Sequence, residues 1–189
     1  VFDQHYMQGV YETQDRASEV VVSAFCQLSA KSDSCFTAKN RRLSVHHSLT
    51  ISQGDTVTLE KIVWLTHRCD KSLSQESFAR NALADLKVCA ARGYDALLES
   101  SAYAWKAVWR DARVEVTCAE QQDQLALDYA VWHLTTMTPA HDERSSIAAK
   151  GLTGEGYKGH VFWDTEIFLL PFHLFTRPQI ARSLLRYRW

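Results

Sequence analysis

The sequence lacks several features that would place it in common classes of protein. It has five cysteines but no Cys-x-x-Cys pair, and an odd count without that spacing argues against both a disulfide framework and a zinc site. It has no Asn-x-Ser/Thr acceptor, no segment that resembles a signal peptide, and no apolar run as long as a membrane span. We therefore expect a reduced, cytoplasmic protein that does not associate with a membrane.

Charge of neither sign is in excess. The 189 residues include 21 basic and 22 acidic side chains, with no basic block that would bind nucleic acid and no acidic tail. Apolar residues make up 46% of the chain and aromatic residues 11%, enough for a core in one domain or two small ones. The sequence starts at Val1 and stops at Trp189, at the end of an amphipathic helix pattern, so we expect a fragment of a longer chain.

Residues 1–70 have the pattern of short β-strands separated by turns. Residues 43–51 alternate roughly with period two, and residues 56–66 are rich in β-branched side chains. This pattern predicts part of a β-sandwich. Adjacent residues of a strand point to opposite faces, so His46 and His47 cannot both ligate a metal from one strand, and we expect no metal site.

Helical spacing replaces the strand pattern in the next part of the chain. Ser72 and Gln75 have the spacing of a capping box and predict the start of a helix, and Gly93 predicts its end. Residues 119–137 are apolar on most sides, which is typical of a helix buried between layers.

Two prolines are expected to mark helix boundaries near the end of the chain. Pro171 interrupts an apolar run, so we expect a helix to end or kink near the residue before it. Pro178 is expected in the first turn of a final helix. On that helix, three arginines are expected to form a solvated face rather than an anion site: Arg182, Arg186 and Arg188.

Residues 151–168, GLTGEGYKGHVFWDTEIF, combine a glycine-rich loop with aromatic and acidic side chains. Four of the seven glycines lie here, so the backbone turns tightly or lies close to a ligand. Two aromatic and two acidic residues follow: Phe162, Trp163, Asp164 and Glu166. A sugar has apolar C–H faces and a rim of hydroxyl groups, which suit aromatic stacking and carboxylate acceptors. The alternative is a glycine-rich connection into a buried aromatic helix.

Two nucleotide-binding motifs are rejected for this stretch. The spacing Gly154-x-Gly156-x-x-Gly159 matches the dinucleotide fingerprint, but no buried strand precedes it and no acidic residue lies about 20 residues on. Lys158 is followed by glycine rather than by serine or threonine, which excludes a Walker loop.

The segment GLTGEGYKGHVFWDTEIFLLPF, followed by TRPQIARSLLRYRW, resembles the family 65 glycoside hydrolases and phosphorylases. That family contains maltose, trehalose, kojibiose and nigerose phosphorylases and, more distantly, acid trehalases. The resemblance is dense over residues 146–189 and weaker before them. It implies an α+β fold with three parts: the C-terminal part of an N-terminal β-sandwich over residues 1–70, linker helices over 71–112, and the first helices of an incomplete (α/α)6 barrel over 113–189.

The resemblance also implies a pocket for the non-reducing glucose of a substrate. Trp163 would stack on or wall the sugar ring, and Asp164 would accept hydrogen bonds from its hydroxyl groups. Four more residues are expected to contribute to substrate binding: Phe162, Glu166, His160 and Lys158. We expect Glu166 to support the helix start, where negative charge is favoured. Residues two apart on a helix do not face the same way, so Asp164 and Glu166 are not expected to form an acid/base pair.

The implied activity is inverting phosphorolysis of an α-glucosidic disaccharide, giving β-glucose 1-phosphate and glucose. One carboxylic acid would protonate the glycosidic oxygen, while inorganic phosphate, already an anion, would attack the opposite face without a general base. We expect the acid and the phosphate site beyond Trp189, so no catalytic residue is assigned and the fragment is expected to be inactive alone. The expected partners are the disaccharide and phosphate, with no cofactor, in a homodimeric parent enzyme.

Two alternatives stay open. A hydrolase of the same family, similar to acid trehalase, would need a second carboxylate to activate water. A non-catalytic carbohydrate-binding module would bind sugar without the rest of the barrel.

Overall fold

The computed structural model of the protein describes these ranges of the chain: residues 5–14, 16–70, 72–117, 120–151 and 156–189. The chain divides into two compact units, residues 1–101 and residues 102–189. In the described ranges strands come first and helices follow, in agreement with the predicted α+β class. Over the same ranges, no helix is both long enough and apolar enough to cross a bilayer.

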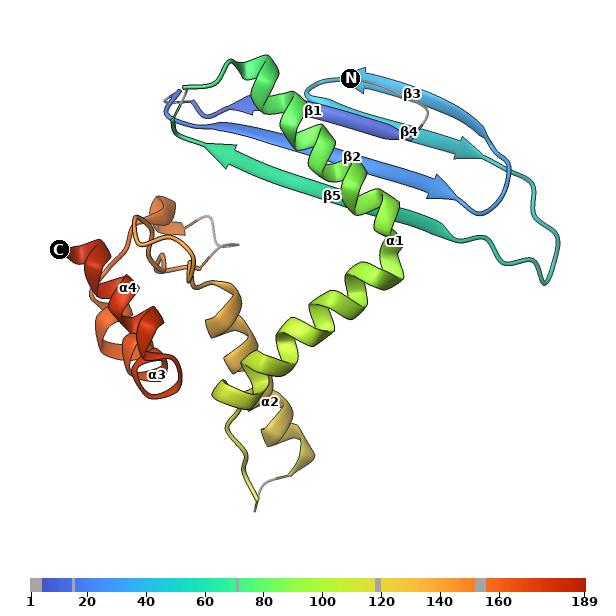
Figure 1. The fold of residues 1–189 in the computed structure, drawn as a ribbon. Coiled ribbons are helices and arrows are strands. Elements are labelled where there is room, and N and C mark those ends of the chain that lie inside the picture. Colours follow the sequence, from blue (N-terminus) through green and yellow to red (C-terminus); the bar gives the residue numbers. More distant parts are fainter. Residues whose placement is uncertain (1–4, 15, 71, 118–119, 152–155) are drawn as a thin grey trace. The chain divides into compact units, whose positions relative to one another are not determined.

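Antiparallel strands form the two sheets of the first unit's described residues (Figure 1). Three of them make one sheet in the order β1-β2-β5: β1 (Tyr6–Glu12), β2 (Glu19–Leu28) and β5 (Leu59–Arg68). The other two pair as a hairpin: β3 (Asp33–Lys39) and β4 (Arg42–Ser48). The alternation in residues 43–51 and the β-branched run in residues 56–66 therefore predicted strands that the structure contains, β4 and β5.

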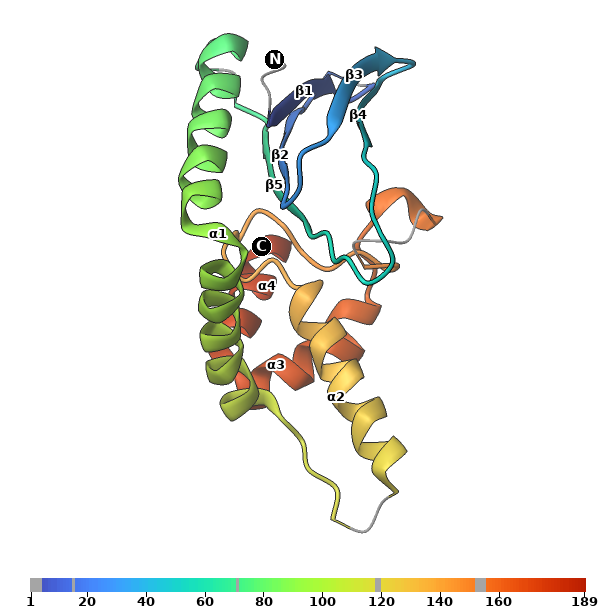
Figure 2. The ribbon, with the colours of Figure 1, turned by 90° about the vertical axis from the view of Figure 1, so that its right-hand side faces the viewer.

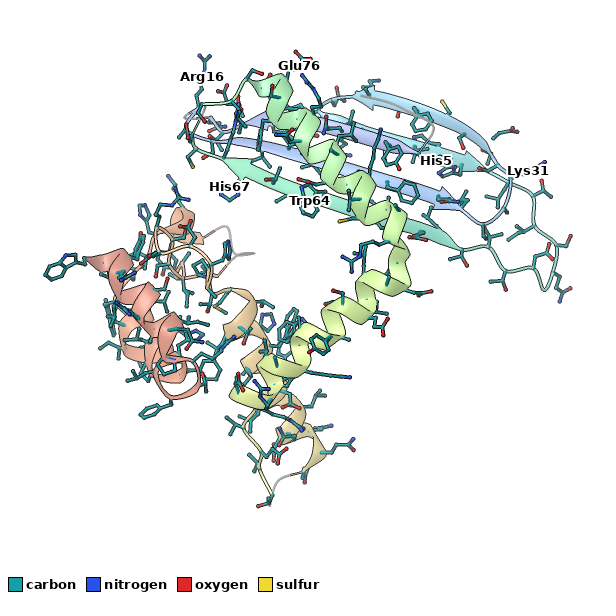
Figure 3. The ribbon with its side chains drawn as sticks, viewed as in Figure 1. His5, Arg16, Lys31, Trp64, His67 and Glu76 are labelled. Carbon is teal, nitrogen blue, oxygen red and sulfur yellow. The ribbon has the colours of Figure 1, made fainter. Side chains whose placement is uncertain are left out.

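The β1-β2-β5 sheet has packing partners on both faces. On one face, Phe25 and Ile62 pack against Leu86 of helix α1 (Gln75–Ala112), whose side chain is fully buried. Trp64, labelled in Figure 3, lies on the same face of β5 as Ile62, because side chains two apart in a strand share a face. On the other face, sheet residues contact the hairpin: Met7, Ala24 and Cys26 against Phe36, Leu43 and Val45. Figure 2 shows these layers edge-on.

Helix α1 has a capped start and a break in its middle. It begins at Gln75, and the Ser74 hydroxyl accepts a hydrogen bond from the Ser77 backbone N–H at 3.2 Å, so the predicted cap at Ser72 is wrong. The cap is the serine that immediately precedes the first helical residue. Gly93, at φ 77° and ψ 165°, interrupts the helix where the sequence predicted its end. A side chain would be strained in that conformation, which explains the glycine.

Short helices and turns form the second unit around one small core. Its elements after the end of α1 are α2 (Gln121–Thr136), the 3₁₀ turn η1 (Gly156–Gly159), the π-helical turn η2 (Thr165–Leu169), α3 (Leu170–Thr176) and α4 (Pro178–Arg188). Pro171 lies in the first turn of α3 and Pro178 begins α4, as predicted. Ile147, Ile180 and Leu184 form the buried core.

Helix α2 is more exposed than its sequence predicted. Its side chains are apolar on most sides, yet Val131 is its one buried residue among those described, with Leu125 68% and Tyr129 62% exposed. The prediction of a helix buried between layers is therefore wrong for the described part of the chain. An apolar side chain is buried only where another element packs over it, and the described residues leave Leu125 and Tyr129 exposed.

Candidate functional site

The glycine-rich stretch contains tight turns. Gly159 has φ +77°, and Tyr157 and Lys158 before it also lie in the left-handed region, at φ 60° and 50°. Side chains disfavour this region by about 1–2 kcal/mol per residue, so η1 holds two residues in conformations of the kind found at ligand sites. Gly154, which belonged to the predicted glycine loop, lies outside the described residues.

Two hydrogen bonds tie this stretch to the core of its unit. The Ala149 backbone N–H donates to the His160 carbonyl at 3.1 Å, which closes the loop at its base. The Thr165 hydroxyl donates to the Ile147 carbonyl at 3.0 Å, and Thr165 is only 2% exposed. Because Ile147 belongs to the buried core, the start of η2 has a fixed support.

Trp163 and Asp164 occupy the central positions of a hydrogen-bonded turn. The Thr165 N–H donates to the Phe162 carbonyl at 3.3 Å, which bends the chain between them. The Glu166 N–H donates to the Trp163 carbonyl at 3.1 Å and continues the bend into η2. π-Helical turns such as η2 are rare in proteins, and those that occur are often found at functional sites.

The Trp163 indole and the Asp164 carboxylate are both available to a ligand. Trp163 is 63% exposed, and its ring centroid lies 5.8 Å from that of Phe168. Asp164 is half-buried. Among the residues that the structure describes, no group hydrogen-bonds the Asp164 carboxylate or the Trp163 N–H. An aromatic face beside an unpaired acceptor has the two properties that hexose binding requires.

Trp163 lies at the surface of its unit. A hollow of ≈ 740 Å³ lies in the other unit, between β1 and the β3–β4 turn, and neither Trp163 nor Asp164 lines it. That hollow is wide open to solvent and its lining residues include none of the six predicted site residues, so its size alone does not make it the candidate site.

Phe162 lies near two other rings. Its centroid is 5.3 Å from that of Tyr157, edge to face, and 6.5 Å from that of His160. The structure thus brings together Phe162 and His160, both predicted, with Tyr157, which the sequence analysis did not single out. Lys158, also predicted, is exposed on η1.

Glu166 is held by an arginine that the sequence assigned to solvent. Arg188 Nε donates to Glu166 Oε1 at 2.8 Å, and Arg188 Nη2 donates to Glu166 Oε2 at 3.1 Å and to the Phe162 carbonyl at 2.8 Å. The hydrogen bonds from Arg188, and then its charge, lower the pKa of Glu166 against the opposing effect of burial. The Glu166 carboxylate is therefore ionised at neutral pH, and both of its oxygens already accept hydrogen bonds from Arg188.

A buried histidine links α3 to the end of α2. His173 is 0% exposed, and its Nε2 lies 2.9 Å from Thr138 Oγ1, whose hydroxyl donates to the Leu134 carbonyl. Because the threonine proton is used there, His173 Nε2–H is the donor. Burial, with the charge of Arg177, lowers the pKa of His173 to about 4, so the ring is neutral at pH 7. Sequence reasoning missed this residue, which carries no motif.

Known proteins similar to the chain share one family. The model of the glycosyl hydrolase family 65 N-terminal domain matches residues 3–108, and that of the family 65 central catalytic domain matches residues 128–189. A solved structure described as a kojibiose phosphorylase from the human microbiome superposes with a TM-score of 0.85 over 100% of this chain and 24% of that chain, at 19% identity. This likeness shows the fold and confirms the predicted α+β class. The predicted boundaries after residues 70 and 112 stay predictions.

Several curated relatives of the chain are disaccharide phosphorylases. The chain is 56% identical to the kojibiose phosphorylase of Escherichia coli (strain K12) over 100% of this chain and 25% of that protein. It is 41% identical to the kojibiose phosphorylase of Halothermothrix orenii over 79% of this chain and 20% of the relative, and 30% identical to the α,α-trehalose phosphorylase of Thermoanaerobacter brockii over 75% and 18%. The chain thus spans at most about a quarter of the length of these relatives. Because both family models match in order along it, the chain belongs to glycosyl hydrolase family 65, as its sequence predicted.

Proposed function

We propose that this chain is part of an inverting disaccharide phosphorylase, which cleaves an α-glucosidic disaccharide with inorganic phosphate to give β-glucose 1-phosphate and glucose. The observation that carries the proposal is the exposed Trp163 indole beside an Asp164 carboxylate that no described group pairs. Membership of family 65 supports it, as do relatives that are kojibiose, nigerose and trehalose phosphorylases. Kojibiose is the first substrate to test.

In this proposal each residue of the turn has a different role in binding the non-reducing glucose. Trp163 walls the ring, and Asp164 accepts hydrogen bonds from its hydroxyl groups. Phe162 and His160 extend the apolar side of the site, with Lys158 at its exposed edge. Glu166 acts through the protein rather than on the sugar, because Arg188 already occupies its carboxylate.

The chemistry requires groups that we place beyond Trp189. The general acid that protonates the glycosidic oxygen lies there, and so do the residues that bind phosphate and the remaining walls of the glucose pocket. Phosphate attacks as an anion and needs no general base, whereas a hydrolase needs a second carboxylate to activate water. The isolated chain is therefore expected to have no activity.

The remaining parts of the proposal concern partners and location. We propose phosphate as co-substrate, no other cofactor, no nucleic-acid or membrane partner, and a homodimeric parent enzyme. A cytoplasmic location is supported by the free cysteines of the described residues: Cys26, Cys35, Cys69 and Cys89. Cys118 lies outside the described residues.

Phosphate dependence tests the proposal. A polypeptide in which this segment is continuous with the rest of the barrel would be incubated with kojibiose, nigerose or trehalose, with and without phosphate. We expect β-glucose 1-phosphate to form only with phosphate present. Equal glucose release in phosphate-free buffer would identify a hydrolase instead, and the lack of any turnover would reject both enzymes.

The binding-module alternative has a separate test. Glucose and kojibiose would be titrated calorimetrically into the chain of residues 1–189. We expect no saturable heat, since the site has only one wall here. Saturable binding by this segment alone would favour the module.

A further inference from the structure

The Arg188 guanidinium hydrogen-bonds both ends of the turn that contains Trp163 and Asp164. Arg188 donates to the Phe162 carbonyl before these two residues and to the Glu166 carboxylate after them. The planar fork of arginine binds the carboxylate through two nitrogens side by side, while one of them also reaches the carbonyl. The two proposed ligand-binding residues thus lie inside a closed set of hydrogen bonds.

The turn is supported from a second side. The Thr165 hydroxyl bonds the carbonyl of Ile147, which packs against Ile180 and Leu184 of α4. Helix α4 also carries Arg188, so the same helix contributes to both supports. A turn fixed at two points holds its backbone in one conformation and so fixes the directions in which Trp163 and Asp164 leave it, which favours a preorganised binding site.

The Arg188–Glu166 pair is poorly suited to a purely stabilising role. The two side chains are 38% and 27% exposed, and ion pairs of this kind are screened by water and contribute little to global stability. A neighbouring pair on the same helix makes a comparison: Arg186 Nη1 lies 2.6 Å from Glu143 Oε2, with exposures of 52% and 53%. Only the Arg188 pair reaches the turn that carries Trp163.

We propose that Arg188 is a positioning residue for the sugar site: by holding the Phe162 carbonyl and the Glu166 carboxylate, it fixes the turn that presents Trp163 and Asp164 to the glucose ring. This inference rests on the proposed function. It also assigns Glu166 its role, as the anchor that receives Arg188.

The first experiment measures the turn itself and needs no substrate. Amide hydrogen exchange would be compared in the complete protein for wild type, Arg188→Gln and the matched control Arg186→Gln. We expect peptides covering residues 160–169 to lose protection by about tenfold or more in Arg188→Gln. The control breaks an exposed pair of the same kind on the same helix, so its peptides are expected to match those of the wild type.

The second experiment measures the consequence for the sugar. Steady-state phosphorolysis of kojibiose by the same variants should show KM raised about tenfold in Arg188→Gln, with kcat changed much less, because the loss is in substrate placement. Arg188→Lys should lie between wild type and Arg188→Gln. The double variant Arg188→Gln/Glu166→Gln should be no worse than Arg188→Gln alone, because the loss of Arg188 already breaks its bonds to Glu166.

The possible results of these experiments distinguish failure of the proposed role of Arg188 from failure of the proposed phosphorylase function. Unchanged exchange at residues 160–169 in Arg188→Gln would overturn the inference, as would raised exchange with unchanged KM in an active enzyme. Identical kinetic losses in Arg186→Gln would also overturn it. A wild-type protein that neither phosphorolyses kojibiose nor binds glucose would overturn the proposed function and the sugar role of Arg188, whereas the exchange data would still show whether Arg188 holds the turn.

Discussion

In the first unit Arg68 pairs with Glu19, and in the second Arg188 pairs with Glu166, but the two pairs have different surroundings. The side chains of Arg68 and Glu19 are only 11% and 8% exposed, and their Nη2 and Oε2 atoms lie 2.5 Å apart. Those of Arg188 and Glu166 are 38% and 27% exposed. Burial removes the screening by water, so we expect the first pair to affect folding and the second to affect only local geometry.

The residues around the buried Arg68–Glu19 pair also indicate that this pair affects folding. Arg68 Nη1 donates to the Leu73 carbonyl at 2.7 Å, and the Arg68 guanidinium lies 4.5 Å from the centroid of the Phe78 ring. Gln75 Nε2 donates to Glu19 at 3.2 Å. The pair therefore joins β2 and β5 to the start of α1, and losing one member leaves a buried charge.

Breaking the buried pair should have the largest effect on stability. Arg68→Met should lower the free energy of unfolding by about 3–5 kcal/mol, because Glu19 loses its charged partner. Urea unfolding measures it. Arg80→Met is the matched control on α1, where the Arg80–Glu76 pair is 68% and 86% exposed. Equal losses in the two variants would remove the distinction between buried and exposed pairs.

The buried histidine predicts that stability falls as the pH drops below about 6.5. The folded pKa of His173 lies below its unfolded value, so its contribution is complete above pH 6.5 and is lost as pH falls toward 4. The loss is at most about 3 kcal/mol. Urea unfolding at pH 7.5, 6, 5 and 4.5 (the last near the folded pKa of about 4) checks it. His173→Phe should flatten this dependence, whereas His67→Asn, at an exposed position of β5, should retain it.

Removing the proposed sugar wall should have a large effect on activity and a small one on folding. Trp163→Ala should lower kcat/KM for kojibiose by about 100-fold, because a stacking ring is lost at the site. Its melting temperature should change little, since the ring is 63% exposed. Tyr103→Ala, at a 78% exposed ring of α1, is the control. A parallel loss in both variants would point to general damage rather than to a site.

The exposed pair should have the smallest effect on stability. Arg188→Gln and Arg186→Gln should each lower the free energy of unfolding by less than about 1 kcal/mol. Urea titration of both variants measures this. A loss several times larger in Arg188→Gln alone would show that the pair stabilises the fold, and would weaken its assignment as a positioning residue.

Local sequence signals predicted what depends on near neighbours. The β-branched run in residues 56–66 predicted β5, and Gly93 and Pro178 predicted a helix break and a helix start, because each acts through its own backbone. The same kind of signal misplaced the cap of α1 by two residues, since Ser72 and Ser74 are both good caps.

The missed features depend on contacts between distant parts of the chain. Arg188 and Glu166 are 22 residues apart, and nothing in a helical pattern shows which carboxylate an outward arginine meets. His173 is buried and hydrogen-bonds Thr138, which is 35 residues away in the sequence and which its own segment does not reveal. The Trp163–Asp164 site was predicted from a family resemblance, while its turn and its unpaired carboxylate required coordinates.

The central claim is that Trp163 and Asp164 together hold one hexose. The most direct measurement is calorimetric titration of glucose into the complete protein and its Asp164→Asn variant, without phosphate or turnover. We expect the wild type to bind and the variant to bind at least about tenfold more weakly, because a charged acceptor is replaced by a neutral amide. Equal affinities for glucose in the two proteins would contradict the claim.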